Sequence, residues 1–144
     1  MSNHGLEERL EEVEGLLEDL IAANEDGRAV LVEGEKDVAA LRALGLEGEI
    51  VRVKGASTVF AVCESVAKAH RAVIILVDWD RGGGRLAALL QDALDANGLR
   101  YDLTFRRDLA RATKKEVVHV EGLAAYVGKL RRAARREPTH RRHV

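Results

Sequence analysis

The sequence predicts an α/β fold: one domain with a four-stranded parallel sheet of order 2-1-3-4, flanked by helices. Two observations predict it. Short apolar runs rich in β-branched residues alternate with segments of 10–15 residues whose apolar positions repeat at helical spacing. The length of 144 residues leaves room for one domain with a single core, and we see no internal repeat or low-complexity linker.

The N-terminal segment 1–26 predicts an amphipathic, acidic helix. Its apolar residues recur every three or four positions, and acidic residues occupy the other face: Leu6, Leu10, Val13, Leu17 and Leu20. The stripe spans about two heptads, which is too short to specify a coiled coil. We therefore favour a helix docked on the domain, and a homodimer through this helix remains the alternative.

The central region 28–112 is expected to form the α/β domain. The strands are expected at 29–32, 50–53, 72–77 and 101–105, and the helices at 36–44, 57–69 and 83–97. Ser57 is the expected N-cap of the second of these helices, and Cys63 lies on its apolar face. The run 72–77 is the most continuously apolar, which predicts a central strand buried on both faces.

A basic stretch follows the fourth strand, and the chain then continues into a C-terminal extension, 113–137. This extension is expected to hold a strand at Val117-Val118 and a helix from about 121 to 136. Pro138, the only proline, marks the expected end of structure, so 138–144 is predicted to be a disordered basic tail.

The formal net charge of −1 is a cancellation between the two ends of the chain. Residues 1–26 sum to −8 and residues 127–144 sum to +6. The single cysteine excludes an intramolecular disulfide and favours a cytoplasmic protein. No apolar run reaches the roughly 18–20 residues that a bilayer requires, so we expect neither a membrane span nor a secretory signal.

Two of the expected strands end in acidic residues. Glu33-Gly34 follows the first strand, with Asp37 one helical turn later, and Asp78-Trp79-Asp80 ends the third strand. Because parallel neighbouring strands end at the same sheet edge, Glu33 and the two aspartates should converge. Taken singly, Asp80 could cap a helix and Glu33 could form a surface ion pair. Together they predict a site for Mg²⁺, with Mn²⁺ as an alternative.

Phosphate-binding candidates surround these acids. Lys36, Lys54 and Arg81 could clamp a phosphate or could be solvated charges. The backbone N–H groups of Gly82 and Gly83 could face an anion at the start of a helix. Arg106 and Arg107 begin the basic stretch, which could follow a nucleic-acid backbone. His119, His140 and His143 show no ligand spacing, so we assign them no metal.

At these motifs the chain resembles the Toprim domain over about residues 28–112. The run Val30-Leu31-Val32-Glu33-Gly34 is similar to the first family motif, and Asp78-Trp79-Asp80-Arg81-Gly82-Gly83 is similar to the second. The size looks most like the small stand-alone Toprim proteins found mainly in archaea, related to the 5S ribosomal RNA maturation nuclease and bacterial-type primases. The resemblance implies Mg²⁺-dependent phosphodiester chemistry on nucleic acid, with Glu33 as general acid/base or metal ligand and Asp78 and Asp80 as metal ligands.

The departures from the family narrow the expected function. Topoisomerases carry a third acid where this chain has Gly82, and primases need a zinc module that one cysteine cannot build. A small nuclease, acting in RNA processing or on DNA, is the leading hypothesis. The alternative is a nucleic-acid-binding subunit of a larger complex that does not cleave. Regulatory binding of a nucleotide is a weaker third option, because no phosphate-binding P-loop is present.

Overall fold

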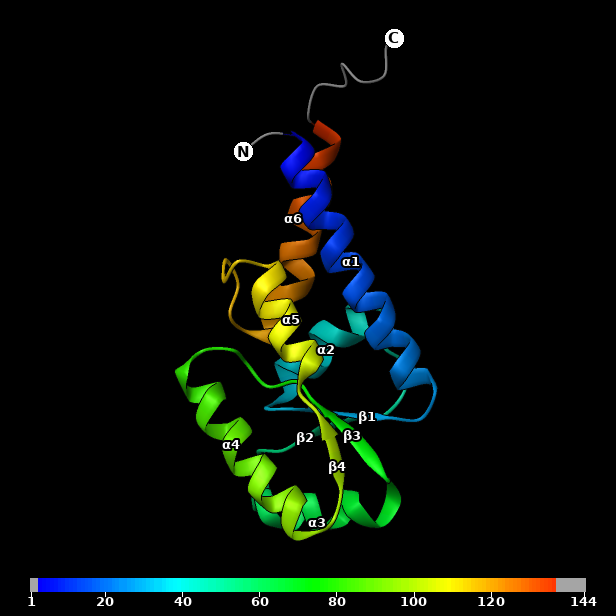
Figure 1. The fold of residues 1–144 in the computed structure, drawn as a ribbon, viewed down its shortest axis with the longest axis vertical. Helices are drawn as coiled ribbons and strands as arrows, with labels where there is room; N and C mark the ends of the chain where they lie inside the picture. Colours follow the sequence, from blue (N-terminus) through cyan, green and yellow to red (C-terminus); the bar gives the residue numbers. More distant parts are fainter. Residues whose placement is uncertain (1–2, 137–144) are drawn as a thin grey trace.

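The computed structural model describes residues 3–136 and shows the predicted parallel sheet (Figure 1). The strand order is β2-β1-β3-β4, so the predicted order 2-1-3-4 is confirmed. The elements follow one another as α1 (Asn3–Glu25), β1 (Ala29–Val32), α2 (Glu35–Leu44), β2 (Ile50–Arg52), α3 (Val59–Ala69), β3 (Ala72–Ile75), α4 (Arg81–Ala96), β4 (Arg100–Asp102), α5 (Thr104–Ala112), the 3-10 turn η1 (Val120–Gly122) and α6 (Leu123–Arg136).

The two central strands are buried on both faces and divide the core in two. Val30 of β1 pairs with Ile50 of β2 and with Ile74 of β3, which sets the register of the sheet. Alternate side chains point to opposite faces of a strand. Thus Val30 and Ile74 join one core cluster with α1, α2, α5 and α6, whereas Leu31 and Ile75 join the other with α3 and α4.

Helix α1 packs against α6, and their outer ends extend away from the sheet as a two-helix arm (Figure 1). We call residues 3–14 of α1 with residues 129–136 of α6 the helical arm. The inner part of the predicted stripe (Val13, Leu17, Leu20) is buried in the core. Leu6 and Leu10, at the outer end of the same stripe, are only half-buried.

Some sequence-based boundaries were wrong. Strand β4 ends at Asp102 rather than 105, and α5 begins at Thr104, whose N–H (2.7 Å) and hydroxyl (2.6 Å) both donate to Asp102 Oδ1. The basic stretch is therefore largely helical. Helix α3 is capped by Thr58, whose hydroxyl accepts from the Ala61 N–H, rather than by Ser57.

The strand expected at Val117-Val118 is absent from the described extension. The chain turns at Lys114 and Lys115, which both have positive φ, and then runs beside the loop after β3 without regular strand pairing. The predicted basic tail 138–144 lies outside the described residues. No helix within residues 3–136 is long and apolar enough to cross a membrane.

Candidate metal centre

The loop after β3 carries the Asp-x-Asp motif to the carboxyl edge of the sheet. Asp80 is the N-cap of α4, and its Oδ1 accepts a 2.7 Å hydrogen bond from the Gly83 N–H. A Cβ atom on Gly83 would lie 1.9 Å from the carbonyl oxygen of Asp78. The glycine after the motif therefore serves a close approach of α4 to the loop, since any side chain would collide with the backbone.

The segment Val117–Val120 of the C-terminal extension fixes this loop from the other side. The Trp79 N–H donates to the Val118 carbonyl (2.9 Å), and the Trp79 indole Nε1–H donates to the Val117 carbonyl (2.6 Å). The Val120 N–H donates to Asp78 Oδ1 (2.8 Å). Only the bond between Trp79 and Val118 joins backbone to backbone, so the segment holds the loop without a regular strand ladder.

His119 projects from the same segment onto the acidic motif. Its Nε2 lies 2.9 Å from Asp80 Oδ2, and ligand atoms of Asp78, Asp80 and His119 all lie within 4.8 Å of one another. Sequence analysis assigned His119 no metal, whereas the structure places its ring beside the two candidate ligands. Its partner is 39 positions away, so a search for local ligand spacing could not find it.

The two aspartates differ in their electrostatic environment. Burial raises the pKa of Asp78, and the negative charge of Asp37 adds to this, while the Val120 N–H acts in the opposite direction. The Gly83 N–H lowers the pKa of Asp80, with a further contribution from His119. A cation placed between these carboxylates would relieve the electrostatic cost of holding Asp78 ionised beside other acids.

Asp78, Asp80 and His119 line a cavity of about 560 Å³ at the sheet edge. Glu33, which directly follows β1, lines the same cavity. Its carboxylate pairs with Lys54 Nζ at 3.0 Å and is not among the three groups that gather within 4.8 Å. Asp37 also lines the cavity, but it is only 6% exposed and its Oδ2 accepts from the Gly34 N–H (3.0 Å), which caps α2. Burial raises the pKa of Asp37.

The predicted phosphate-binding residues separate into two groups. Lys36, Lys54, Gly82 and Gly83 line the cavity, together with Glu121, which sequence analysis did not single out. The others do not line it: Arg81 and Arg107 are exposed, and Arg107 pairs with the neighbouring Asp108, while Arg106 is half-buried.

Arg106 holds the backbone beneath the site. Its guanidinium donates to the carbonyl of Val77 (3.2 Å) and twice to the carbonyl of Asp78 (3.1 and 2.9 Å). Burial lowers its pKa, and the charges of Asp80 and Asp78 oppose that effect. The side chain thus holds the loop after β3, whereas sequence analysis offered it as a residue that could follow a nucleic-acid backbone.

The donor set suits a divalent cation. Carboxylate oxygens are the ligands that Mg²⁺ prefers, and a nearby imidazole nitrogen is compatible with Mn²⁺. Asp78 uses one carboxylate oxygen for the Val120 N–H, and no further hydrogen bond within residues 3–136 joins its carboxylate. The second oxygen is therefore available to a ligand. The fold and this site define an α/β domain with an acidic candidate cation site at the carboxyl edge of its sheet.

Comparison with known proteins identifies the class. A family model described as the Toprim domain matches residues 28–111, and the chain belongs to the Toprim domain family. It is 38% identical over 123 residues to a UPF0292 protein of Methanosarcina barkeri, with 85% of each chain covered. A UPF0292 protein of Archaeoglobus fulgidus is 36% identical over 114 residues, which cover 79% of this chain and 88% of that protein.

A solved structure shows a similar arrangement. A protein from Aquifex aeolicus superposes with a TM-score of 0.64 and 26% sequence identity, covering 74% of this chain and 94% of that chain. The match to Methanosarcina barkeri, at 123 residues, extends beyond the region 28–111 that the family model covers. Similarity to these proteins therefore includes part of the helical elements that flank the sheet domain.

Proposed function

We propose that this chain is a small nuclease that hydrolyses phosphodiester bonds of RNA or DNA with the help of a divalent cation. The observation that carries the proposal is the gathering of Asp78, Asp80 and His119 at the sheet edge that Glu33 also lines. Membership of the Toprim domain family supports the same chemistry. Hydrolysis needs only water as co-substrate, and a bound divalent cation can activate that water.

Asp78 and Asp80 would hold the cation through carboxylate oxygens, and His119 would add a nitrogen. When bound, Mg²⁺ or Mn²⁺ supplies charge neutralisation at the phosphate and lowers the pKa of a water molecule. The hydrogen bonds from Val120 and Gly83 hold the carboxylates in place before any ligand arrives. Such fixed outer contacts favour affinity because less reorganisation is needed on binding.

Glu33 is the candidate general acid or base. In hydrolysis its carboxylate would take a proton from the attacking water or return one to the leaving oxygen. Lys54 lies 3.0 Å from this carboxylate and would orient it. Lys36 and Lys54 also line the cavity, where their positive charges would attract the phosphate of the substrate.

The test compares cleavage of structured RNA, single-stranded DNA and duplex DNA with Mg²⁺, Mn²⁺ or EDTA. We expect cation-dependent cleavage of one class, and a loss of at least about 100-fold in the double variant Asp78→Asn/Asp80→Asn. The matched control is Asp92→Asn/Asp95→Asn, which removes two exposed acids of α4 away from the site. Cleavage that survives the first double variant would contradict the assignment.

Glu33→Gln separates proton transfer from cation binding. This variant should retain cation affinity by titration calorimetry and lose cleavage, whereas Glu47→Gln, at an exposed position that does not line the cavity, should retain both. Nucleic-acid binding without cleavage by the unsubstituted chain on every substrate would instead favour the non-cleaving subunit of a larger complex.

A further inference from the structure

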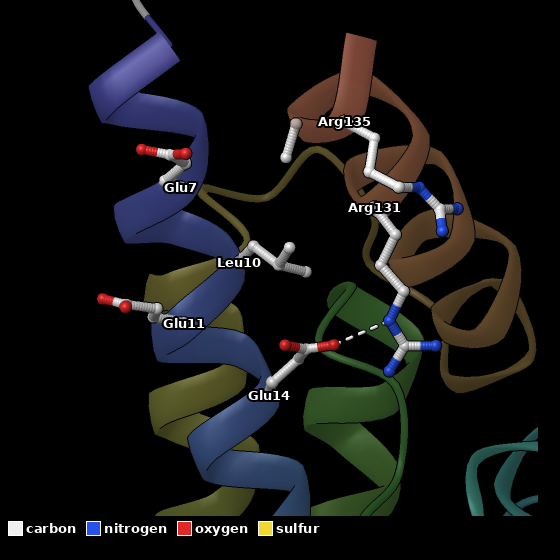
Figure 2. Close-up of a pocket in the computed structure, with 7 residues that line it drawn as sticks. Glu7, Leu10, Glu11, Glu14, Arg131 and Arg135 are labelled. Atoms are coloured by element: carbon white, nitrogen blue, oxygen red, sulfur yellow. Dashed lines mark hydrogen bonds and ion pairs between the residues drawn. The ribbon is translucent and has the colours of Figure 1, made fainter. Parts of the chain in front are cut away.

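A groove of about 740 Å³ runs along the helical arm between α1 and α6 (Figure 2). Glu7 and Glu11 stand on the α1 side, and Arg131 and Arg135 stand on the α6 side. We call these the acidic wall and the basic wall of the arm groove. None of the residues that line this groove lines the cavity of the metal centre.

The charges of the two walls are largely uncompensated within residues 3–136. The only ion pair across the groove within residues 3–136 joins Glu14 to Arg131 Nε at 2.6 Å. Figure 2 shows the carboxylates of Glu7 and Glu11 directed away from α6, and the guanidinium of Arg135 directed away from α1. Glu7, Glu11 and Arg135 make no ion pair with another described residue, so each wall can meet an outside charge.

Apolar side chains lie between the walls. Leu10 points into the space between the helices, and Ala134 lies on the α6 side. Leu10 continues the stripe whose inner members, Val13 and Leu17, are 0% and 4% exposed. The apolar stripe is therefore buried where α1 packs on the domain and only half-buried along the arm, where a further apolar surface could cover it.

Because the arm groove has one acidic and one basic wall, the grooves of two copies of the chain can be complementary in charge. A two-fold dimer uses the same patch on both copies. An axis running along the groove would place the acidic wall of each copy opposite the basic wall of the other, whereas an axis across it would oppose like charges. A nucleic acid is a poorer occupant, because the acidic wall would repel its phosphates.

We propose that the arm groove is a homodimer interface, in which a second copy packs its arm parallel to the first. Glu7 and Glu11 of one copy face Arg135 and Arg131 of the other (Figure 2). A two-fold axis along the groove keeps each side chain at its own height on the arm, so each pair forms between residues at similar heights. Leu10 and its counterpart close the apolar centre. This interface is independent of the activity proposed for the metal centre.

The test is a charge exchange between two variants, followed by sedimentation velocity. Glu7→Arg/Glu11→Arg makes both walls basic, and Arg131→Glu/Arg135→Glu makes both walls acidic. Each variant alone should dimerise at least about tenfold more weakly than the unsubstituted chain, because like charges then face each other. An equimolar mixture should restore the dimer as a heterodimer, since both pairs of walls are again complementary.

The matched control is Glu64→Arg/Asp92→Arg, which changes the net charge by the same amount as Glu7→Arg/Glu11→Arg, at exposed positions of α3 and α4, and should leave dimerisation unchanged. Circular dichroism checks that every variant is folded. Salt gives a second readout on the unsubstituted chain, whose dimer should weaken as ionic strength rises. A monomer at about 100 µM, a dimer insensitive to salt, or a mixture that fails to recover would overturn the proposal.

Discussion

The backbone N–H of Val120 donates a hydrogen bond of 2.8 Å to the carboxylate of Asp78, although the two residues are 42 positions apart in the chain. Asp78 belongs to the acidic motif at the end of β3, and Val120 begins the turn η1 of the C-terminal extension. The orientation of a candidate metal ligand is thus set by a residue outside the region 28–111 that the Toprim model matches.

Trp79 should anchor the acidic loop to the extension. In Trp79→Phe the indole N–H is lost and the Val117 carbonyl loses its donor, so we expect about 1–3 kcal/mol less free energy of unfolding. Urea denaturation followed by circular dichroism measures this change. Phe60→Leu is the matched control: Phe60 is 52% exposed, and its replacement should change stability by less than about 0.5 kcal/mol. Equal losses in the two variants would refute the anchoring role.

Gly83→Ala should destabilise the protein by about 3 kcal/mol, because the new Cβ would overlap the Asp78 carbonyl. Gly82→Ala provides the comparison, since the nearest atom to a Cβ there is 3.7 Å away. That substitution should be neutral or stabilise the start of α4 by up to about 1 kcal/mol. Thermal unfolding of the two variants distinguishes them, and similar melting temperatures would contradict the close approach.

Arg106→Met should cost about 1–3 kcal/mol of stability, because it removes the donors to the Val77 and Asp78 carbonyls. Arg107→Met removes an exposed side chain paired only with its neighbour Asp108 among the described residues, and should change stability by less than about 0.5 kcal/mol. Chemical denaturation checks both. Equal losses of stability in the two variants would contradict a structural role that Arg106 has and Arg107 lacks.

Glu116 should make stability depend on pH on the acid side. Burial alone would raise the pKa of Glu116, but hydrogen bonds from Tyr126 and Arg9 outweigh it and lower the pKa below its usual 4.5. The ion pair therefore stabilises the fold above about pH 4.5, and the stabilisation is lost as pH falls through the lowered pKa. Stability measured from pH 7 to pH 3 should fall more steeply for the unsubstituted chain than for Glu116→Gln.

At neutral pH, Glu116→Gln should cost about 1–2 kcal/mol, because Arg9 is only 6% exposed and would lose its carboxylate partner. The expected loss of stability is moderate because the Glu116 side chain is itself 50% exposed. Glu14→Gln, at the pair with Arg131 on the arm, should cost less than about 1 kcal/mol. A larger loss in Glu14→Gln than in Glu116→Gln would reverse this assignment.

The strand order could be predicted because it rests on patterns within short windows. The runs at 29–32 and 72–77 are apolar throughout, which marks central strands, and glycines end several of the helices. Helix α5 was missed because Tyr101, Leu103 and Phe105 alternate with polar residues as an edge strand would. The hydrogen bonds that Thr104 donates to the Asp102 carboxylate compete with a continued strand, and they depend on backbone geometry.

The acidic edge could be predicted for a similar reason, since the topology of a parallel sheet brings the ends of β1 and β3 together. The contribution of His119 could not, because it depends on where an irregular segment lies in space. Charge alone could not reveal the backbone contacts of Arg106 either: within a basic stretch an arginine is a candidate phosphate ligand, and the structure adds that its guanidinium donates to backbone carbonyls.

The hydrogen bonds between Trp79 and the segment Val117–Val120 have a consequence for synthesis of the protein. The chain emerges from the ribosome N-terminus first, so the sheet can begin to form while the extension is still being made. The acidic loop acquires its partners at Val118 and Val120 only when synthesis has passed residue 120. A nascent chain that has completed all four strands but has not reached residue 120 lacks these hydrogen bonds, so we expect the acidic loop to become ordered only after the extension is made.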